Sequence, residues 1–281
     1  MTSLLRCWVR LWIGCWVALA LGSSPARAGD EPLRVVFVGN SYTYTNDLPM
    51  LFRALVHSQN PKRDVQTEAF VTPGGYLNER WREGVVQRYL KANRVDVLVL
   101  QEAGGLLSCA DSPTRRSTFA CTDSLRTHKR YAEFAAKLGV RAVIFGTWGA
   151  DVREQSSISR VTRRLSKAID ALPADAGEAI LALRKLDPNA ELFTDRILHP
   201  SPEVSMLAAI TLYARIEGWL PDAQAITLAQ PLISVAAQPD ASIPLSMQYS
   251  TLPRTQYGGF SKERMRVLRQ AAESALADDD H

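Results

Sequence analysis

The chain has 281 residues, of which 46% are apolar, and it contains only 16 glycines and 15 prolines. This composition excludes a disordered or collagen-like chain, and the length is sufficient for a sizeable hydrophobic core. The formal net charge of +4 comes without any tract of basic residues. We therefore predict no nucleic-acid partner.

Residues 1–28 have the pattern of a secretory signal peptide. Two arginines among the first ten residues precede an almost wholly apolar stretch at residues 11–22, and a small-x-small motif ends at Ala28. The apolar stretch is short for a bilayer span, so we predict cleavage rather than an uncleaved anchor helix. The remaining 29–281 would form one periplasmic or secreted domain with no membrane span.

Hydrophobic periodicity predicts strands that alternate with helices along this domain. In chain order, we expect a strand at 33–38, a helix at 48–58, a strand at 65–71, a helix at 77–92, a strand at 95–100, a helix at 123–138, a strand at 140–145, a helix at 157–171, a short fifth strand at Leu192 and Phe193, and helices at 202–217 and 261–277. Ser201 is placed to cap the helix that begins at Pro202. This alternation favours a mostly parallel sheet with helices on both faces.

Two segments fall outside the alternation. Residues 103–122 contain both cysteines that remain after cleavage, Cys109 and Cys121, and are predicted to be an insertion closed by a disulfide. A metal pair is the alternative, but CxxC spacing and nearby histidines are missing, so we predict no metal. Residues 221–258 contain five prolines and are predicted to be rich in loops.

In open parallel sheets, ligands bind at the carboxyl ends of the strands, and polar residues follow the first three predicted strands. Ser41 follows the first strand, Gly74 and Gly75 follow the second, and Gln101 follows the third. A serine at such a turn suits a nucleophile, the glycines let a backbone approach a ligand, and the amide can donate into a cleft. The alternatives are a helix cap, a simple turn and a solvated loop residue.

His199 is the histidine best placed for chemistry. It lies in a loop before the helix at 202–217, whereas His57 and His128 fall in amphipathic helices and His281 is terminal. A neutral imidazole near pH 7 suits a general base for a serine hydroxyl. The alternative is a histidine at a helix start without a partner. The scattered histidines and the missing HExxH motif do not indicate zinc.

The order of these signals resembles the SGNH (GDSL-like) hydrolase superfamily, in the exported branch whose first block is Gly-Asn-Ser. The matching segments are GNSYTYTNDLP (39–49), PGGYLNERWREG (73–84), VDVLVLQEA (95–103), FGTW (145–148) and LHPSPEVSMLAAITLYARI (198–216). The resemblance implies a three-layer α/β/α, flavodoxin-like fold. It also implies an esterase, lipase, thioesterase or carbohydrate deacetylase that needs no cofactor.

The resemblance also assigns roles to residues. Ser41 matches the nucleophile and His199 the base, and the oxyanion would be held by the N–H groups of Ser41 and of Gly75 or Gly74. Gln101 stands where much of the superfamily has asparagine, and we expect its amide to be the third oxyanion donor. These roles imply a Ser-His(-Asp) hydrolase that acts on ester bonds.

One position departs from the superfamily pattern. The orienting aspartate usually lies three residues before the histidine, where this chain has Arg196, while Asp195 lies four residues before. Either Asp195 orients His199, or a backbone carbonyl does so and the site is a dyad. Arg196 could then point into the cleft and bind an anionic substrate group.

The substrate predictions rest on aromatic residues and on export. Aromatic side chains near the strand ends could form a platform for a sugar ring or could be ordinary core residues: Tyr42, Tyr44, Tyr76, Trp81 and Trp148. We expect an exported serine esterase acting on a small-molecule or glycan ester, with O-acetyl groups on a glycan as the first choice and a short-chain lipid or small ester as the alternative. A catalytically inactive protein of the same fold that binds a glycan or cell-envelope component is the second hypothesis. Nucleotide binding is disfavoured because neither GxGxxG nor GxxxxGK[ST] follows the first strand.

Overall fold

A five-stranded parallel sheet forms the centre of the structure, a computed structural model in which residues 32–277 are described. Its strands are β1 (Leu33–Gly39), β2 (Val65–Val71), β3 (Val97–Leu100), β4 (Arg141–Gly146) and β5 (Leu172–Asp175). They run in the order β2-β1-β3-β4-β5, the flavodoxin-like order, and all neighbours are parallel. The predicted signal peptide lies outside the described residues.

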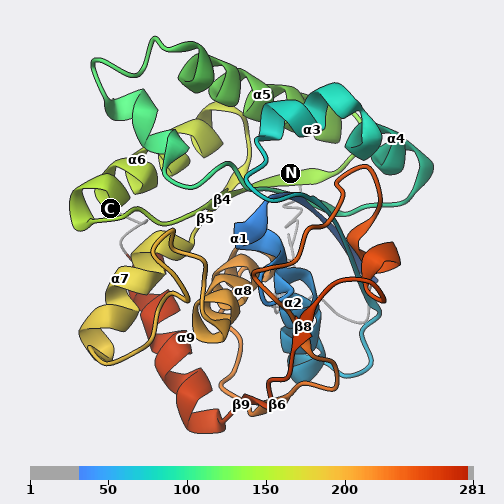
Figure 1. Cartoon of the computed structure of the whole chain (residues 1–281), viewed down its shortest axis with the longest axis vertical. Helices are drawn as coiled ribbons and strands as arrows, with labels where there is room; N and C mark the ends of the chain where they lie inside the picture. Colours follow the sequence, from blue (N-terminus) through green and yellow to red (C-terminus); the bar gives the residue numbers. More distant parts are fainter. Residues whose placement is uncertain (1–31, 278–281) are drawn as a thin grey trace, which may run out of the picture.

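Helices cover both faces of the sheet (Figure 1). One face carries α2 (Leu48–Gln59), α7 (Ala176–Leu186), α8 (Pro202–Glu217) and α9 (Lys262–Ala277), and the other carries α3 (Leu77–Glu83), α4 (Val85–Ala92), α5 (Phe119–Ala136) and α6 (Val152–Ala168). The predicted three-layer α/β/α fold is confirmed.

Alternate residues of each central strand enter different cores. Val35 and Phe37 of β1 pack with α2 and α8, whereas Val36 and Val38 pack with α3, α4 and α5. Successive side chains of a strand point to opposite faces, and here both faces are covered. This explains why the strand reads as an unbroken apolar run.

The prediction of a fifth strand at Leu192 and Phe193 is wrong. The fifth strand is β5, and Phe193 forms only an isolated antiparallel bridge with Pro200. β5 is four residues long and contains Pro173, which is tolerated because the strand lies at the sheet edge. So short a strand, interrupted by proline, gives almost no periodic signal, and α7, which follows it directly, was also not predicted.

Several helix boundaries also differ from the predictions, for identifiable reasons. The single helix expected at 77–92 is divided at Gly84, whose φ of +67° ends α3 before α4 begins. Helix α6 begins at Val152, earlier than predicted, because the Asp151 side chain caps it by accepting from the Glu154 N–H at 2.8 Å. Helix α8 begins as predicted, with Ser201 Oγ accepting from the Val204 N–H at 3.3 Å.

The predicted disulfide between Cys109 and Cys121 is present. It joins the 3₁₀ helix η1 (Leu106–Asp111) to the first turn of α5, so α5 begins inside the predicted insertion at 103–122.

The loop-rich segment that follows α8 contains only short elements. They are β6 (Ile226–Thr227), β7 (Leu232–Ile233), η2 (Leu245–Gln248), β8 (Arg254–Thr255) and β9 (Gly259–Phe260), of which β6 pairs with β9 and β7 with β8. Within residues 32–277, no helix combines the length and the apolar character required to cross a bilayer.

Candidate active site

Ser41 lies at the carboxyl end of β1, where the sheet order reverses between β1 and β3. It is the first residue of the short helix α1 (Ser41–Tyr44), and the Asn40 side chain caps this helix by accepting from the Tyr42 N–H at 3.1 Å. Gly39, two residues before Ser41, has no room for a side chain. A Cβ there would collide with the Gln101 side chain and lie 2.8 Å from Thr43 Oγ1. The switch point of such a sheet is where ligands bind.

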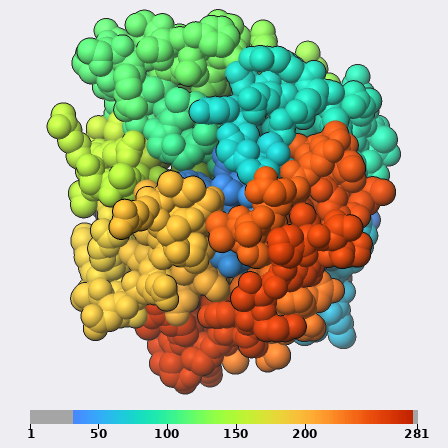
Figure 2. Space-filling view, in the orientation of Figure 1, coloured from blue at the N-terminus to red at the C-terminus, as the bar shows by residue number. Residues whose placement is uncertain are grey.

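One face of the molecule is hollowed. Figure 2 shows atoms of the blue, N-terminal part of the described chain at the bottom of a depression, with chain segments coloured teal, green, gold and orange around its rim. Ser41 is 7% exposed and His199 is 9% exposed. Both side chains are therefore held largely within the protein.

The Asp195 carboxylate is bound to His199 through both of its oxygens. Oδ2 lies 2.6 Å from His199 Nδ1, and Oδ1 accepts the backbone N–H groups of His199 at 3.1 Å and of Ile197 at 3.0 Å. Since a carboxylate accepts, Nδ1 carries the proton and Nε2 is left as the acceptor. Partial burial raises the pKa of Asp195, but the hydrogen bonds from His199 outweigh it and the net shift is downward.

The segment that carries His199 is docked onto the residue next to Ser41. The Tyr42 hydroxyl donates to the Ile197 carbonyl at 3.0 Å, and the Tyr42 ring lies edge-on to the His199 imidazole with centroids 6.0 Å apart. Trp148 stacks on Tyr42 at 4.6 Å and donates its indole N–H to the Leu198 carbonyl at 2.9 Å. Segments that are far apart in sequence are thereby joined at one rim of the sheet.

Backbone strain accompanies this docking. Leu198 has a φ of +65°, in the left-handed region that non-glycine residues rarely adopt. Its neighbour His199 is fixed on the other side by the Thr194 N–H, which donates to the His199 carbonyl at 2.9 Å. Such strain persists only where surrounding contacts determine the conformation.

The reactive atoms of the predicted pair make no hydrogen bonds inside the described part of the chain. Neither Ser41 Oγ nor His199 Nε2 has a protein partner there, so the two are also not bonded to each other. In unliganded sites such bonds are often long and tighten only when substrate binds.

The Gln101 amide, expected to donate to the oxyanion, is bound within the protein. Its Oε1 accepts the Asn40 N–H at 2.8 Å and the Thr43 hydroxyl at 2.9 Å, while its Nε2 donates to the carbonyl of Glu102. The side chain is 1% exposed. It therefore holds the turn after β1 against the end of β3, and its role as an oxyanion donor stays a prediction.

The glycine turn after β2 is tied to the same place. The Asn40 side-chain amide donates to the Gly75 carbonyl at 3.0 Å, and Gly74 has a φ of +60° that favours glycine. The Gly75 N–H makes only a long bond, 3.3 Å, to the Thr72 carbonyl. The sequence indicated Asn40, Ser41 or Thr43 as a cap of the helix that follows, and Asn40 is the cap. Its bond to the glycine turn was not predicted.

The remaining sequence candidates are placed as follows. Arg196 is exposed and forms no ion pair with another described residue. Glu102, the residue after Gln101, accepts hydrogen bonds from the Leu77 and Ala103 N–H groups and from the Ser124 hydroxyl through its carboxylate. Among the proposed platform residues, Tyr44 and Trp148 are buried in the core, whereas Tyr76 is 43% exposed. No three potential ligands among His, Cys, Asp and Glu are grouped for a metal ion within residues 32–277.

The sheet order and the two helical layers define a three-layer α/β/α protein, which is consistent with the SGNH hydrolase fold. No protein-family model matches the chain, and no curated protein sequence matches it. The likeness is to solved structures. One is a protein assigned to the SGNH hydrolases from Slackia heliotrinireducens, with 21% identity and a TM-score of 0.51, covering 66% of this chain and 99% of that one.

Two further structures extend the comparison. A DUF4886 family protein from Bacteroides uniformis is 12% identical with a TM-score of 0.53, covering 89% of this chain and 96% of its own. A catalytic mutant of Axe2, an acetylxylan esterase from Geobacillus stearothermophilus, is 14% identical with a TM-score of 0.50. The match covers 66% of this chain and 94% of the Axe2 chain. At these identities, the likeness is one of fold.

Proposed function

We propose that this protein is a serine hydrolase of carboxylic esters. His199 Nε2 takes the proton from Ser41 Oγ, which attacks the acyl carbonyl of the substrate. His199 then gives this proton to the leaving alcohol, and a water molecule activated by the same imidazole releases the acyl group from Ser41. Asp195 holds the Nδ1 proton and stabilises the imidazolium that forms between these steps.

The observation that carries the proposal is the pair of contacts made by Asp195. Its Oδ2 lies 2.6 Å from His199 Nδ1, and its Oδ1 fixes the backbone of the same loop. A histidine held in this tautomer has Nε2 available as a base, and Tyr42, the residue after Ser41, joins the histidine loop to the serine turn. A histidine that served only to begin α8 would need no such support.

The developing oxyanion would be held by backbone donors. The Ser41 N–H and the Gly75 N–H are the two we assign, because Asn40 ties the glycine turn to the serine turn. The Gln101 amide is a third candidate, whose nitrogen would have to turn from the Glu102 carbonyl. Each oxyanion donor typically contributes about 10²–10³ in turnover.

The substrate we favour is an O-acetylated glycan outside the cytoplasm. The pattern at residues 1–28 and the Cys109–Cys121 disulfide support export, since disulfides persist in oxidising compartments. The likeness in fold to an acetylxylan esterase makes acetylated xylo-oligosaccharides the first glycan to test. Arg196, exposed beside Asp195, would face an anionic group of a charged substrate.

The test is covalent labelling with a fluorophosphonate probe together with hydrolysis of p-nitrophenyl acetate. We expect labelling and turnover in the parent protein, and loss of both in Ser41→Ala with an unchanged circular dichroism spectrum. Ser156→Ala is the matched control, because the Ser156 hydroxyl only bonds back to its own helix at Val152. Labelling at another residue, or full activity of Ser41→Ala, would overturn the nucleophile assignment.

The alternative, an inactive binding protein with this fold, rested on the shifted position of Asp195 and on glutamine rather than asparagine at position 101. Because Asp195 reaches His199 from that position, the geometry supports the enzyme. A folded parent protein that neither labels nor hydrolyses esters would favour the binding protein instead.

A further inference from the structure

A cavity of about 220 Å³ lies between α3, η1 and α5. Two of its wall residues are direct chain neighbours of the residues that form the catalytic turn. Tyr76 follows Gly75, whose carbonyl is bound by Asn40, and Glu102 follows Gln101, which is bound to the Asn40 N–H. The cavity is therefore bordered by the residues that directly follow the two turns tied to Asn40.

Exposed aromatic side chains mark this cavity. Phe119 is 71% exposed and Tyr76 is 43% exposed, and both line it. Large apolar side chains that lie together at the surface indicate a surface that a partner covers. By contrast, Tyr44 and Trp148 are buried at 1% and 2% exposure and offer no ring to a ligand.

Polar groups stand beside the aromatic rings. Asn78, Glu79 and Arg82 of α3 line the same cavity, and the side chains of Glu79 and Arg82 are 46% and 63% exposed. An aromatic surface with a few polar groups fits a ligand that has an apolar face and hydroxyls at its edge. Asn78 and Arg82 already bind Asp123, and Glu79 accepts the Tyr76 N–H, so these groups form an ordered polar edge beside the rings. A pyranose ring offers hydroxyls to such an edge, whereas a simple acyl chain offers none.

The disulfide joins the walls of the cavity. Leu106 comes from η1, and Phe119 and Ala120 come from the first turn of α5. Cys109 and Cys121 connect these two elements with Cα atoms 5.8 Å apart. Phe119 lies two residues before Cys121, so the bridge fixes the position of its backbone.

We propose that this cavity is a subsite for one sugar ring of the ester substrate, with Phe119 and Tyr76 as the residues that determine glycan specificity. The inference rests on the proposed esterase function and names the substrate class of that site. The volume is below the roughly 300–1,000 Å³ typical of pockets that enclose a drug-sized ligand. It therefore seats one ring of a longer chain, adjacent to the ring that carries the ester.

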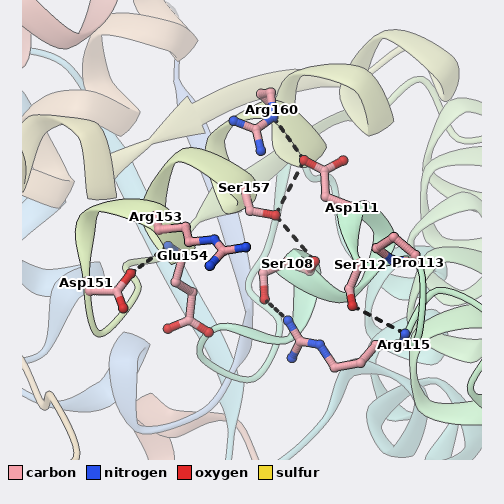
Figure 3. A pocket seen from close by; sticks show the side chains of 10 residues that line it. All are labelled: Ser108, Asp111, Ser112, Pro113, Arg115, Asp151, Arg153, Glu154, Ser157 and Arg160. Carbon is pink, nitrogen blue, oxygen red and sulfur yellow. Dashed lines mark hydrogen bonds and ion pairs between the residues drawn. The ribbon is translucent and has the colours of Figure 1, made fainter.

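A neighbouring cavity of about 370 Å³ has a different character (Figure 3). It lies between η1 and α6, none of the ten side chains drawn there is aromatic, and its charges are partly satisfied by pairs such as Arg160 with Asp111 at 3.0 Å. Beside it lies Val152, the first residue of α6, which is 60% exposed. Val152 matches Phe119 as an exposed apolar residue at the start of a helix and serves as the control.

The test compares two substrates, an acetylated xylo-oligosaccharide and p-nitrophenyl acetate, which has no sugar ring. In Phe119→Ala and in Tyr76→Ala, we expect the ratio of kcat/KM for the oligosaccharide to kcat/KM for the aryl acetate to fall about tenfold, mainly through KM, as the loss of an aromatic contact implies. Val152→Ala should leave this ratio at the parent value. The double variant Cys109→Ala with Cys121→Ala should lower it, because it releases Phe119.

A binding measurement separates this inference from the proposed function. Ser41→Ala is titrated with unacetylated xylo-oligosaccharide by calorimetry, and adding Phe119→Ala should weaken binding about tenfold. Equal binding in the two proteins, no binding by Ser41→Ala, or an unchanged substrate ratio would each overturn the subsite. A parent protein that binds the oligosaccharide through Phe119 but hydrolyses no ester would support the subsite and contradict the esterase.

Discussion

Asp195 Oδ2 lies 2.6 Å from His199 Nδ1, although four positions rather than three separate the two residues. Leu198, between them, has a φ of +65°, and in this conformation of the loop the carboxylate reaches the ring. Oδ1 of the same carboxylate binds the N–H groups of Ile197 and His199. A spacing of four residues therefore brings the carboxylate into contact with the imidazole.

This relationship makes Asp195 the first residue to test. Asp195→Asn keeps Oδ1 as an acceptor for the backbone but loses the charged partner of Nδ1. We expect kcat for p-nitrophenyl acetate to fall by up to about 10⁴ with little change in KM, because the wrong tautomer of His199 is favoured. Asp170→Asn is the control, since Asp170 is exposed in the left-handed region, which asparagine also tolerates. Parent-level kcat in Asp195→Asn would show that the carboxylate has no catalytic part.

Gln101 could either hold the turn after β1 in place or donate to the oxyanion, and a substitution at this residue distinguishes the two roles. Gln101→Met has a similar shape but leaves the Asn40 N–H and the Thr43 hydroxyl without their acceptor. Each stranded buried donor costs about 1–3 kcal/mol, so we expect the free energy of unfolding and kcat to fall together. If kcat falls while denaturant unfolding stays at the parent midpoint, the amide acts on the oxyanion instead.

The disulfide has a measurable effect on stability. Closing the short loop between Cys109 and Cys121 stabilises the fold by roughly 3 kcal/mol in the loop-entropy estimate. We expect reduction by dithiothreitol to lower the unfolding midpoint in urea by a corresponding amount. The variant with both cysteines replaced by alanine should not respond to the reductant. An unchanged midpoint after verified reduction would contradict this account.

The buried carboxyl group of Asp47 makes the free energy of unfolding depend on pH. It caps α2 and is fully buried, and burial raises its pKa from 3.8 to about 6. A raised pKa means that the folded state binds the proton more tightly, so this group lowers the free energy of unfolding as pH rises from about 4 to about 6. The full effect for a pKa shift of this size is on the order of 3 kcal/mol.

The corresponding experiment is urea unfolding of Asp47→Asn between pH 4 and pH 7.5. Asparagine keeps the acceptor for the Met50 N–H but does not titrate, so the decline in stability should become shallower. It should not vanish, because burial also raises the pKa of Asp175 to about 6. A slope identical to that of the parent protein would contradict the assignment to Asp47.

The buried strands, the α8 cap and the order of polar residues along the chain could all be predicted from local sequence patterns. The runs at β1 and β3 are apolar because both faces of the sheet are covered, and Ser201-Pro202 begins α8 through local hydrogen bonding and a fixed φ. These signals are local, so they can be read without knowledge of the fold. The same is true of the Cys109–Cys121 pair, whose partners are close in sequence.

Features that depend on contacts between distant residues could not be predicted and became apparent in the folded chain. β5 is a strand because β4 pairs with it at the sheet edge, not because its own four residues favour one. Asp195 can orient His199 because Tyr42 and Trp148 hold the loop by its carbonyl groups, and Gln101 supports a turn because β1 and β3 are neighbours. A cysteine pair indicated a closed loop, but only packing of that loop against α3 brought Phe119 next to Tyr76. Such contacts join residues far apart in the chain, and no local pattern encodes them.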